Sequence, residues 1–301
     1  MVSKAFVVLN PVAGNSDAGA LRQSLERRFA DVDWSYEVYR TTGEERVTEI
    51  VRAALDRDFD VFVAVGGDGT VSGVAAGLVH TDIPLGIIPV GTGNALARDL
   101  GVPLNSEEAL RLLTGEHSVV DIDAMQAGDR IYLLNVTVGI SAVVMRDTER
   151  QDKRRLGMLA YVWTGFRKLL GWQPHRFNVV ADGQMHRFRA SEVAVVNAGA
   201  IGDPSLRWGP QVHLDDGRLD ACVLRAQSAA GYLRLAWSML LHRQRRDPGL
   251  RCLVVERHIT IHTGRPLPVQ ADGEFVGHTP VDISVVPGAV RMIVPQSWPL
   301  R

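Results

Sequence analysis

The sequence of 301 residues predicts an α/β domain followed by a β-rich domain. In the first part of the chain, short apolar runs alternate with helix-like stretches, which is typical of a doubly wound α/β domain. From Phe177 onwards, short alternating segments separated by turns dominate, and they predict a β-sandwich or a strongly bent antiparallel sheet. We place the boundary near Asp121, which gives domains at 1–122 and 123–287. The C-terminal stretch, about 288–301, is a candidate to return to the first domain.

Each strand expected in the first domain is a mainly apolar run beside a helical stretch, as a sheet covered on both faces requires. Polar turns at Asn10, Gly66 and Gly91 follow three of these strands. Because ligands of open α/β sheets bind beyond the carboxyl ends of the strands, we expect the three turns to face one crevice. The expected strands are Lys4–Leu9, Trp34–Tyr39, Val61–Val65 and Pro84–Ile88. The expected helices are one through Leu21, Leu25 and Phe29, then Glu45–Leu55 with Thr42 as its N-cap, Val71–His80 and Ala95–Leu100.

The segment Gly66-Gly67-Asp68-Gly69-Thr70 lies at a predicted strand-to-helix turn. Glycine lets the backbone approach a phosphate closely, and the N–H groups of such a turn can face it. An acid in the middle of the turn would repel a phosphate unless a magnesium ion lies between them. The segment therefore predicts a nucleotide-phosphate cradle with a metal-linked Asp68. The alternative is a tight turn whose aspartate makes only local hydrogen bonds.

Beyond the boundary, the sequence predicts many short strands and two longer helices. The first helix is expected over 151–170 and carries the aromatic residues Tyr161, Trp163 and Phe166. The second is expected over Ala229–His242 and is followed by the basic residues Arg243, Arg245 and Arg246. The first helix could pack in the core or contact the membrane. The second could be an ordinary solvated helix or lie on an anionic membrane surface. The expected strands are Tyr132–Val138, Arg176–Ala181, His186–Arg189, Glu192–Asn197, Leu219–Leu224, Cys252–Val255, His258–Thr263, Val281–Val285 and Val290–Val294.

Composition excludes several classes of protein. The formal net charge is -1, so the chain has no overall attraction to nucleic acid, and we expect no nucleic-acid partner. We find no apolar run of about 18 residues or more and no signal-peptide pattern, so we expect a cytoplasmic protein, with peripheral contact at the inner face of the membrane left open. Cys222 and Cys252 lack metal-like spacing, and we expect buried thiols in a reducing compartment. The oligomeric state stays open, a dimer included.

Several motifs, taken together, carry a family resemblance. They are Asn10-Pro11-Val12-Ala13-Gly14, Gly66–Thr70, Pro89-Val90-Gly91-Thr92-Gly93-Asn94, Val120-Asp121-Ile122, Gly157–Tyr161, Leu214–Asp220 and Asp272-Gly273-Glu274. With these motifs in order over nearly the whole chain, the sequence resembles the diacylglycerol-kinase catalytic family, which contains bacterial lipid kinases, sphingosine kinases and ceramide kinases. The resemblance implies a nucleotide-binding α/β domain, a lipid-binding β-sandwich and an active site between them.

The resemblance also implies an ATP-dependent lipid kinase that uses Mg²⁺ and a lipid presented by a membrane surface. Asp272 would be the general base that takes the proton from the lipid hydroxyl as it attacks the γ-phosphate. Glu274 lies two residues further on, so in a strand it would share a face with Asp272. Asp68 would be the third residue in the catalytic set. The residues that would hold ATP are Asn10, Pro11, Gly14, Thr41, Gly66, Gly67, Asp68, Gly69, Thr70, Gly91, Thr92 and Asn94.

Two magnesium positions follow from the same resemblance. Asp68 would join a magnesium ion through water, and Asp121 lies where the family has another acid of that network. Asp216 would bind a structural magnesium ion together with backbone carbonyls at His213 and Arg218, because oxygen ligands suit this ion.

Some features leave alternatives open. Asn94 is followed by Ala95, where bacterial diacylglycerol kinases usually have an aspartate, so one acid of their magnesium network is missing. An NAD kinase shares the Gly-Gly-Asp-Gly turn, but neither Asn135 nor Asn197 is followed by the glutamate expected there. A nucleotide-binding regulatory protein without kinase activity is the third interpretation. Asp272 could also be the corner of a hairpin.

Overall fold

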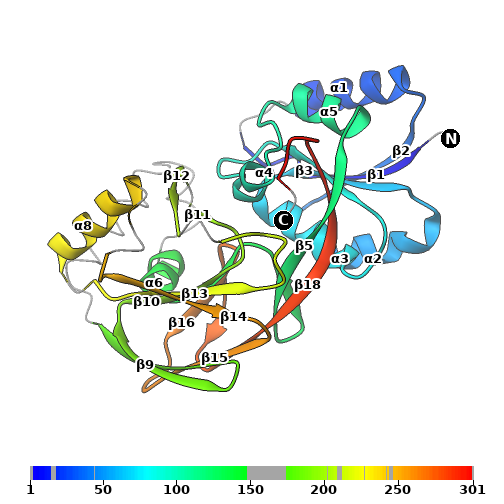
Figure 1. Cartoon of the computed structure of the whole chain (residues 1–301). Helices are drawn as coiled ribbons and strands as arrows, with labels where there is room; N and C mark the ends of the chain where they lie inside the picture. The colour runs from blue at the N-terminus through cyan, green and yellow to red at the C-terminus, as the bar shows by residue number, and fades with distance from the viewer. Residues whose placement is uncertain are drawn as a thin grey trace.

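The computed structural model describes residues 3–14, 18–43, 45–147, 174–201, 203–208, 212–226, 228–241, 243 and 247–299. These residues form an α/β domain and a β-sandwich that lie side by side (Figure 1). The helix expected over 151–170 lies outside the described residues, as do Arg245 and Arg246. Within the described residues, no helix is both long enough and apolar enough to cross a membrane.

The first domain is built around four parallel strands in the order β2-β1-β3-β4. β3 is buried at every position, because its valine-rich run lies at the centre of the sheet with helices on either face. The strands are β1 (Lys4–Leu9), β2 (Ser35–Arg40), β3 (Val61–Gly66) and β4 (Leu85–Pro89). The helices are α1 (Ala18–Asp31), α2 (Val47–Ala54), a 3-10 turn at Leu55–Arg57, α3 (Asp68–Leu78), α4 (Ala95–Asp99) and α5 (Ser106–Thr114).

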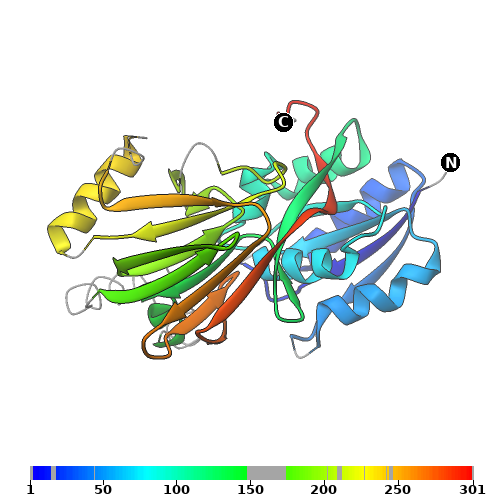
Figure 2. The ribbon, with the colours of Figure 1, turned by 60° about the horizontal axis from the view of Figure 1, so that its bottom comes forward.

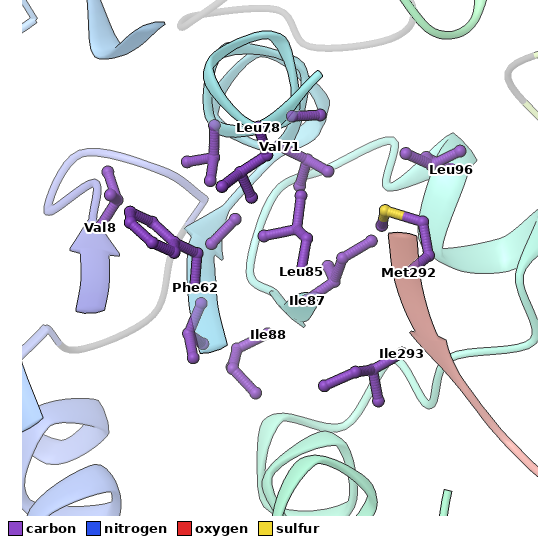
Figure 3. Packing of buried hydrophobic residues seen from close by; sticks show 14 of the residues in the cluster. Val8, Phe62, Val71, Leu78, Leu85, Ile87, Ile88, Leu96, Met292 and Ile293 are labelled. Atoms are coloured by element: carbon purple, nitrogen blue, oxygen red, sulfur yellow. The ribbon is translucent and has the colours of Figure 1, made fainter. Parts of the chain in front are cut away.

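Helix α3 is fixed over this sheet by its apolar side chains. Val71 and Leu78 are buried, and they point toward the sheet beside Phe62 and Leu85 (Figure 3). Met292 belongs to the same core although it lies near the C-terminus of the chain. The start of α3, where Gly66–Thr70 lies, is therefore held in place by a packed core.

Two long strands run from one domain into the other (Figures 1 and 2). They are β5 (Ser118–Ala127) and β18 (Val281–Val294), which pair antiparallel along most of their length. β18 also pairs with β4, where Met292 lies opposite Leu85. The C-terminal part of the chain thus lies in the first domain, and the boundary expected at residue 122 falls inside β5.

The described part of the second domain has two large sheets packed face to face and a two-stranded sheet of β11 and β12. One is the continuation of the first sheet through β18-β15-β8-β9, and the other has the order β14-β13-β10-β7-β16-β17. Its core joins Phe177 and Ile259 of the first sheet to Val138 and Val223 of the second. The elements are β6 (Arg130–Tyr132), β7 (Asn135–Gly139), α6 (Ile140–Asp147), β8 (His175–Ala181), β9 (Gln184–Ala190), β10 (Glu192–Val196), β11 (Ala200–Ile201), β12 (Asp203–Arg207), β13 (Leu219–Leu224), α8 (Ala229–Leu240), β14 (Leu250–Val255), β15 (His258–Thr263), β16 (Pro268–Ala271) and β17 (Glu274–His278).

Three local expectations were wrong. The helix after β2 begins at Val47 with Arg46 as its N-cap, and the hydroxyl of Thr42 instead donates to the Glu45 carboxylate. The strand expected over Tyr132–Val138 is broken after Tyr132, so that β6 and β7 are separate. The two strands expected near the C-terminus are one, β18, with a bulge between Val286 and Val290.

The expectation of free thiols was also wrong. Cys222 and Cys252 lie directly opposite each other on β13 and β14, and they form a disulfide. Their separation of 30 residues gave no sign of this, because strand register decides which side chains meet. The cysteines therefore no longer support a reducing compartment.

Candidate functional site

The turns after β1 and β3 are joined through Asn10. Its side-chain amide donates to the Thr70 hydroxyl at 3.1 Å, and its side-chain oxygen accepts from the Val12 N–H at 3.1 Å. Thr70 is buried in the first turn of α3. Asn10 thus shapes its own turn, which includes Pro11, and ties it to the start of α3.

The turns after β3 and β4 meet backbone against backbone. A Cβ atom placed on Gly91 would lie 2.5 Å from the Cα of Gly67, closer than real Cβ atoms come. Gly14 has φ +64, and a Cβ there would lie 1.9 Å from the Val90 carbonyl oxygen. Glycine is therefore required at these contacts, and the three turns form one surface at the carboxyl ends of the parallel strands, as expected.

The remaining residues expected at the nucleotide lie on or beside this surface. Thr41 is buried directly after β2, where its N–H donates to the Leu9 carbonyl, and Thr92 is exposed. Asn94 has φ +51, and its side chain both accepts from the N–H and donates to the carbonyl of Gly91, at 3.0 and 2.7 Å. The Asn94 amide therefore holds the shape of its own loop.

Asp68 is the first residue of α3. One carboxylate oxygen accepts from the Leu96 N–H at 3.2 Å, so Asp68 links α3 to the start of α4. Its other oxygen faces Gly93, where a Cβ would come within 2.9 Å. Burial raises the pKa of Asp68, and hydrogen bonds from the backbone around residues 94–96 oppose that rise.

Asp272 occupies a two-residue hairpin between β16 and β17. It has φ +47 and Gly273 has φ +85, the backbone that a tight Asp-Gly turn requires. The backbone of Asp272 is therefore the corner of a hairpin, as one interpretation expected. Its carboxylate reaches helix α3 of the α/β domain. Its Oδ1 accepts from the N–H groups of Leu134 at 2.9 Å and Asn135 at 3.0 Å. Its Oδ2 accepts from the Leu133 N–H at 2.8 Å and from the Ser72 hydroxyl at 2.9 Å.

The contact with Ser72 brings Asp272 close to Asp68. Ser72 lies four residues after Asp68 on α3, so the two side chains share one face, with Cβ atoms about 5–6 Å apart. Burial raises the pKa of the Asp272 carboxyl, and its four hydrogen-bond donors act in the opposite direction. A half-buried carboxylate thus lies one helical turn from the glycine-rich surface.

Glu274 does not share a face with Asp272, because Asp272 lies in a turn and not in a strand. The Glu274 side chain is exposed and forms an ion pair with Arg130 at 3.0 Å. The expectation of a shared face was wrong. Sequence analysis also missed the donors to Asp272. The backbone amides give no sequence signal, whereas the four-residue spacing of Asp68 and Ser72 could have revealed Ser72.

Asp121 lies away from this group. It is exposed, and its carboxylate lies 3.6 Å from the Arg291 side chain on the neighbouring strand. Asp123, two residues further along β5, is buried and accepts from the N–H groups of Gly217 at 2.7 Å and Gly288 at 2.8 Å. Asp123 is therefore the acid of β5 that contacts the loop 213–218, and sequence analysis overlooked it.

The loop 213–218 is where the family resemblance places a structural magnesium ion. Burial, together with the negative charges of Asp216 and Asp215, raises the pKa of Asp123. Carboxylates that repel one another favour a bound cation with oxygen ligands. Within the described residues, no three acidic, histidine or cysteine side chains are grouped as a metal site, so magnesium here would need main-chain oxygens such as those of His213 and Arg218. The Arg218 side chain itself is paired with Glu256.

A pocket of about 430 Å³ lies at another part of the domain junction. Of the expected site residues it contains only His213, and its walls include Arg98, Arg207 and Trp298. Asp68 and Asp272 are not among its lining residues, so it is distinct from the glycine-rich surface.

The fold and the site define a two-domain protein in which three glycine-rich turns of an α/β domain lie near a half-buried carboxylate of a β-sandwich. A family model of the diacylglycerol kinase catalytic domain matches residues 4–127. A model of the YegS C-terminal NAD kinase beta sandwich-like domain matches residues 134–294. The chain belongs to this family of diacylglycerol and YegS-like lipid kinases.

Named relatives match over most of their length. A diacylglycerol kinase of Bacillus subtilis is 25% identical over 300 residues, which cover 98% of this chain and 97% of the relative. A probable lipid kinase YegS-like of Stenotrophomonas maltophilia is 32% identical, with 87% of each chain covered. The crystal structure of a putative diacylglycerol kinase from Bacillus anthracis superposes with a TM-score of 0.84 at 27% identity, covering 99% of this chain and 97% of that one.

The contact between Gly67 and Gly91 can be tested by adding one methyl group. We expect Gly91→Ala to force the two turns apart and to weaken ATP binding by at least about tenfold, because the added Cβ meets main-chain atoms. Gly264→Ala is the matched control, since a Cβ at Gly264, which lies after β15 in the β-sandwich, meets nothing within 4 Å. Isothermal titration calorimetry with ATP and magnesium measures both variants, and equal affinities would contradict the close contact.

Proposed function

We propose that the chain is an ATP-dependent lipid kinase, which transfers the γ-phosphate to a hydroxyl of diacylglycerol or a related lipid. The observation that carries the proposal is the position of Asp272, which is hydrogen-bonded to α3 one turn after Asp68. An acid of the β-sandwich thereby lies beside the three glycine-rich turns of the α/β domain. Phosphoryl transfer requires this kind of arrangement, with a phosphate cradle and a proton acceptor close together.

In this mechanism the turns of Asn10–Gly14, Gly66–Thr70 and Gly91–Asn94 hold the ATP phosphates through main-chain N–H groups. Asp68 lies at the N-terminus of α3, where it can orient magnesium beside those phosphates. Magnesium, when bound, neutralises charge on the phosphates. Asp272 accepts the proton of the lipid hydroxyl, and its burial makes it more basic than an exposed aspartate.

The hypothesis of an NAD kinase rests on the shared Gly-Gly-Asp-Gly turn, and the family description of the β-sandwich also mentions NAD kinase. The relatives named diacylglycerol kinase and lipid kinase favour a lipid acceptor. A direct assay for NADP formation separates the two enzymes. A nucleotide-binding regulator without activity would bind ATP and phosphorylate no lipid in a broad panel.

The role of Asp272 is tested by Asp272→Asn. We expect ATP binding to persist and transfer of labelled γ-phosphate to lipid vesicles to fall by at least about a hundredfold, since an amide cannot accept the proton. Glu274→Gln is the control, because Glu274 is exposed and paired with Arg130; we expect less than about a threefold change. Turnover by Asp272→Asn at the wild-type rate would remove the base assignment, provided that circular dichroism shows a folded variant.

The pH dependence of the reaction gives a second test of Asp272. A general base acts in its deprotonated form, so activity is lost as the pH falls through its pKa. Because burial raises the pKa of Asp272, we expect the acid limb of kcat/KM to lie above the ordinary aspartate value of about 3.9. The measurement is kcat/KM for lipid between about pH 4 and 8 on vesicles of fixed composition. A rate that stays constant down to the ordinary value would contradict the assignment.

A lipid substrate must be reached at a membrane surface, and α8 offers a suitable face. Leu233, Trp237 and Leu241 are spaced four residues apart, and their exposed fractions are 68%, 64% and 47%. On the other side of the same helix, Leu235 and Met239 pack into the core. A helix with apolar side chains on both sides is expected where one side packs on the protein core and the other contacts a second apolar environment, such as a membrane.

The charge around α8 suits an anionic membrane. The helix contains no acidic residue, the buried carboxylate of Asp247 is paired with Arg234 at 3.1 Å, and Arg243 is exposed. We therefore propose that this face of α8 lies on the anionic lipid surface that presents the substrate. Tryptophan suits such an interface because its ring combines an apolar body with one polar N–H.

Vesicle binding tests the α8 face. We expect Trp237→Ser to reduce cosedimentation with phosphatidylglycerol vesicles by roughly three- to tenfold, because an inserted apolar side chain is lost. Met185→Ser is the matched control, since Met185 is 62% exposed on β9, away from α8. Equal binding by both variants, or dissociation of a dimer by Trp237→Ser in sedimentation velocity, would overturn the membrane assignment.

A further inference from the structure

The hydrogen-bonding capacity of Asp272 is completely used in this structure. A carboxylate has about four acceptor positions, and the Asp272 carboxylate accepts four hydrogen bonds. Three of the donors are the backbone N–H groups of residues 133–135, between β6 and β7 of the same domain. The fourth donor is the Ser72 hydroxyl, which belongs to α3 of the other domain.

A lipid hydroxyl must donate its hydrogen to a carboxylate oxygen before Asp272 can take the proton. It therefore has to replace one of the four donors. The backbone amides are fixed, because the Asp272 N–H itself donates to the Asn135 carbonyl and holds the hairpin against β7. The Ser72 hydroxyl lies on a side chain that can rotate about its Cα–Cβ bond. Replacing this donor therefore costs less free energy than replacing a backbone amide.

Ser72 also presents the same chemical group as an acceptor lipid with a primary hydroxyl. Its side chain is a CH₂–OH group, and it reaches Asp272 from the helix that begins at Asp68. The Ser72 oxygen therefore lies on the side of Asp272 that faces the phosphate turns. An alcohol attacking a phosphate there must approach Asp272 from this same side.

We propose that Ser72 is a positioning residue that occupies, in the substrate-free enzyme, the place on Asp272 that the lipid hydroxyl takes when it binds. The inference rests on the proposed lipid kinase function. Lipid binding then exchanges one hydroxyl donor for another and releases a contact between α3 and the β-sandwich. The carboxylate keeps four donors before and after the exchange, so none of its acceptor positions is left unsatisfied.

Steady-state kinetics on lipid vesicles test this exchange. In the wild type, lipid binding must break the Ser72 hydrogen bond to a charged group, whereas in Ser72→Ala it displaces only a mobile water. We expect Ser72→Ala to lower KM for the lipid by roughly three- to tenfold, and to leave kcat within about twofold. Ser72→Thr keeps the hydroxyl and is the matched control, with KM expected within about twofold of the wild type.

Other outcomes would overturn the inference. If Ser72 relayed the proton, Ser72→Ala would lower kcat by about a hundredfold with KM unchanged. If Ser72 only held the domains together, Ser72→Ala would leave KM unchanged or raise it, with a lower midpoint of thermal unfolding. If the wild type phosphorylates diacylglycerol and Ser72→Ala has the same KM, the exchange of hydroxyl donors is refuted while the proposed kinase function stands. A wild type inactive on every lipid tested would refute the proposed function and the exchange with it.

Discussion

The carboxylate of Asp272 joins segments of both domains at their junction. A carboxylate that is partly removed from water needs hydrogen-bond donors around it, and here they come from two places that are far apart in the sequence. The break between β6 and β7 turns three consecutive N–H groups toward it, and the Asp-Gly hairpin carries it to them. Ser72 of helix α3 is the fourth hydrogen-bond donor. The Asp272 side chain therefore links the Asp-Gly hairpin, the segment between β6 and β7, and the α/β domain.

The second constraint is the sheet shared by the two domains. Because β5 and β18 pair along most of their length, the β-sandwich is joined to the α/β domain through main-chain hydrogen bonds. The bulge of β18 turns the Gly288 N–H onto Asp123, and the loop 213–218 closes over the same carboxylate. At the junction, Asp272 accepts from the N–H groups of residues 133–135 and from the Ser72 hydroxyl, and the buried Asp123 accepts from the N–H groups of Gly217 and Gly288. The glycine-rich turns therefore lie beside a domain junction that these hydrogen bonds hold in place.

Much of the fold could be predicted from the sequence. The four parallel strands, the turns at Asn10, Gly66 and Gly91 and the β-rich second half all follow from hydrophobic period and glycine placement. Predictions failed where a residue's position depended on a distant partner. The face of Glu274 was misjudged because a turn interrupts the strand period at Asp272. Asp121 was chosen through the family resemblance of Val120-Asp121-Ile122, and only the contact with the distant loop 213–218 reveals Asp123. The disulfide escaped notice because it depends on strand register alone.

By itself, the sequence determined the local features of the candidate site: the glycines that allow three turns to touch, Asp68 at the start of a helix, and an acid in an Asp-Gly turn. These are local properties, since they depend on side-chain type and on the conformation of a few neighbouring residues. Only the tertiary structure decided what the acid contacts. Ser72 and Asp272 are 200 residues apart, and the amides of Leu134 and Asn135 carry no information in their side chains. Their meeting follows from how the sandwich packs on α3, because hydrogen bonds between distant segments are fixed by packing and register, which no short stretch of sequence specifies.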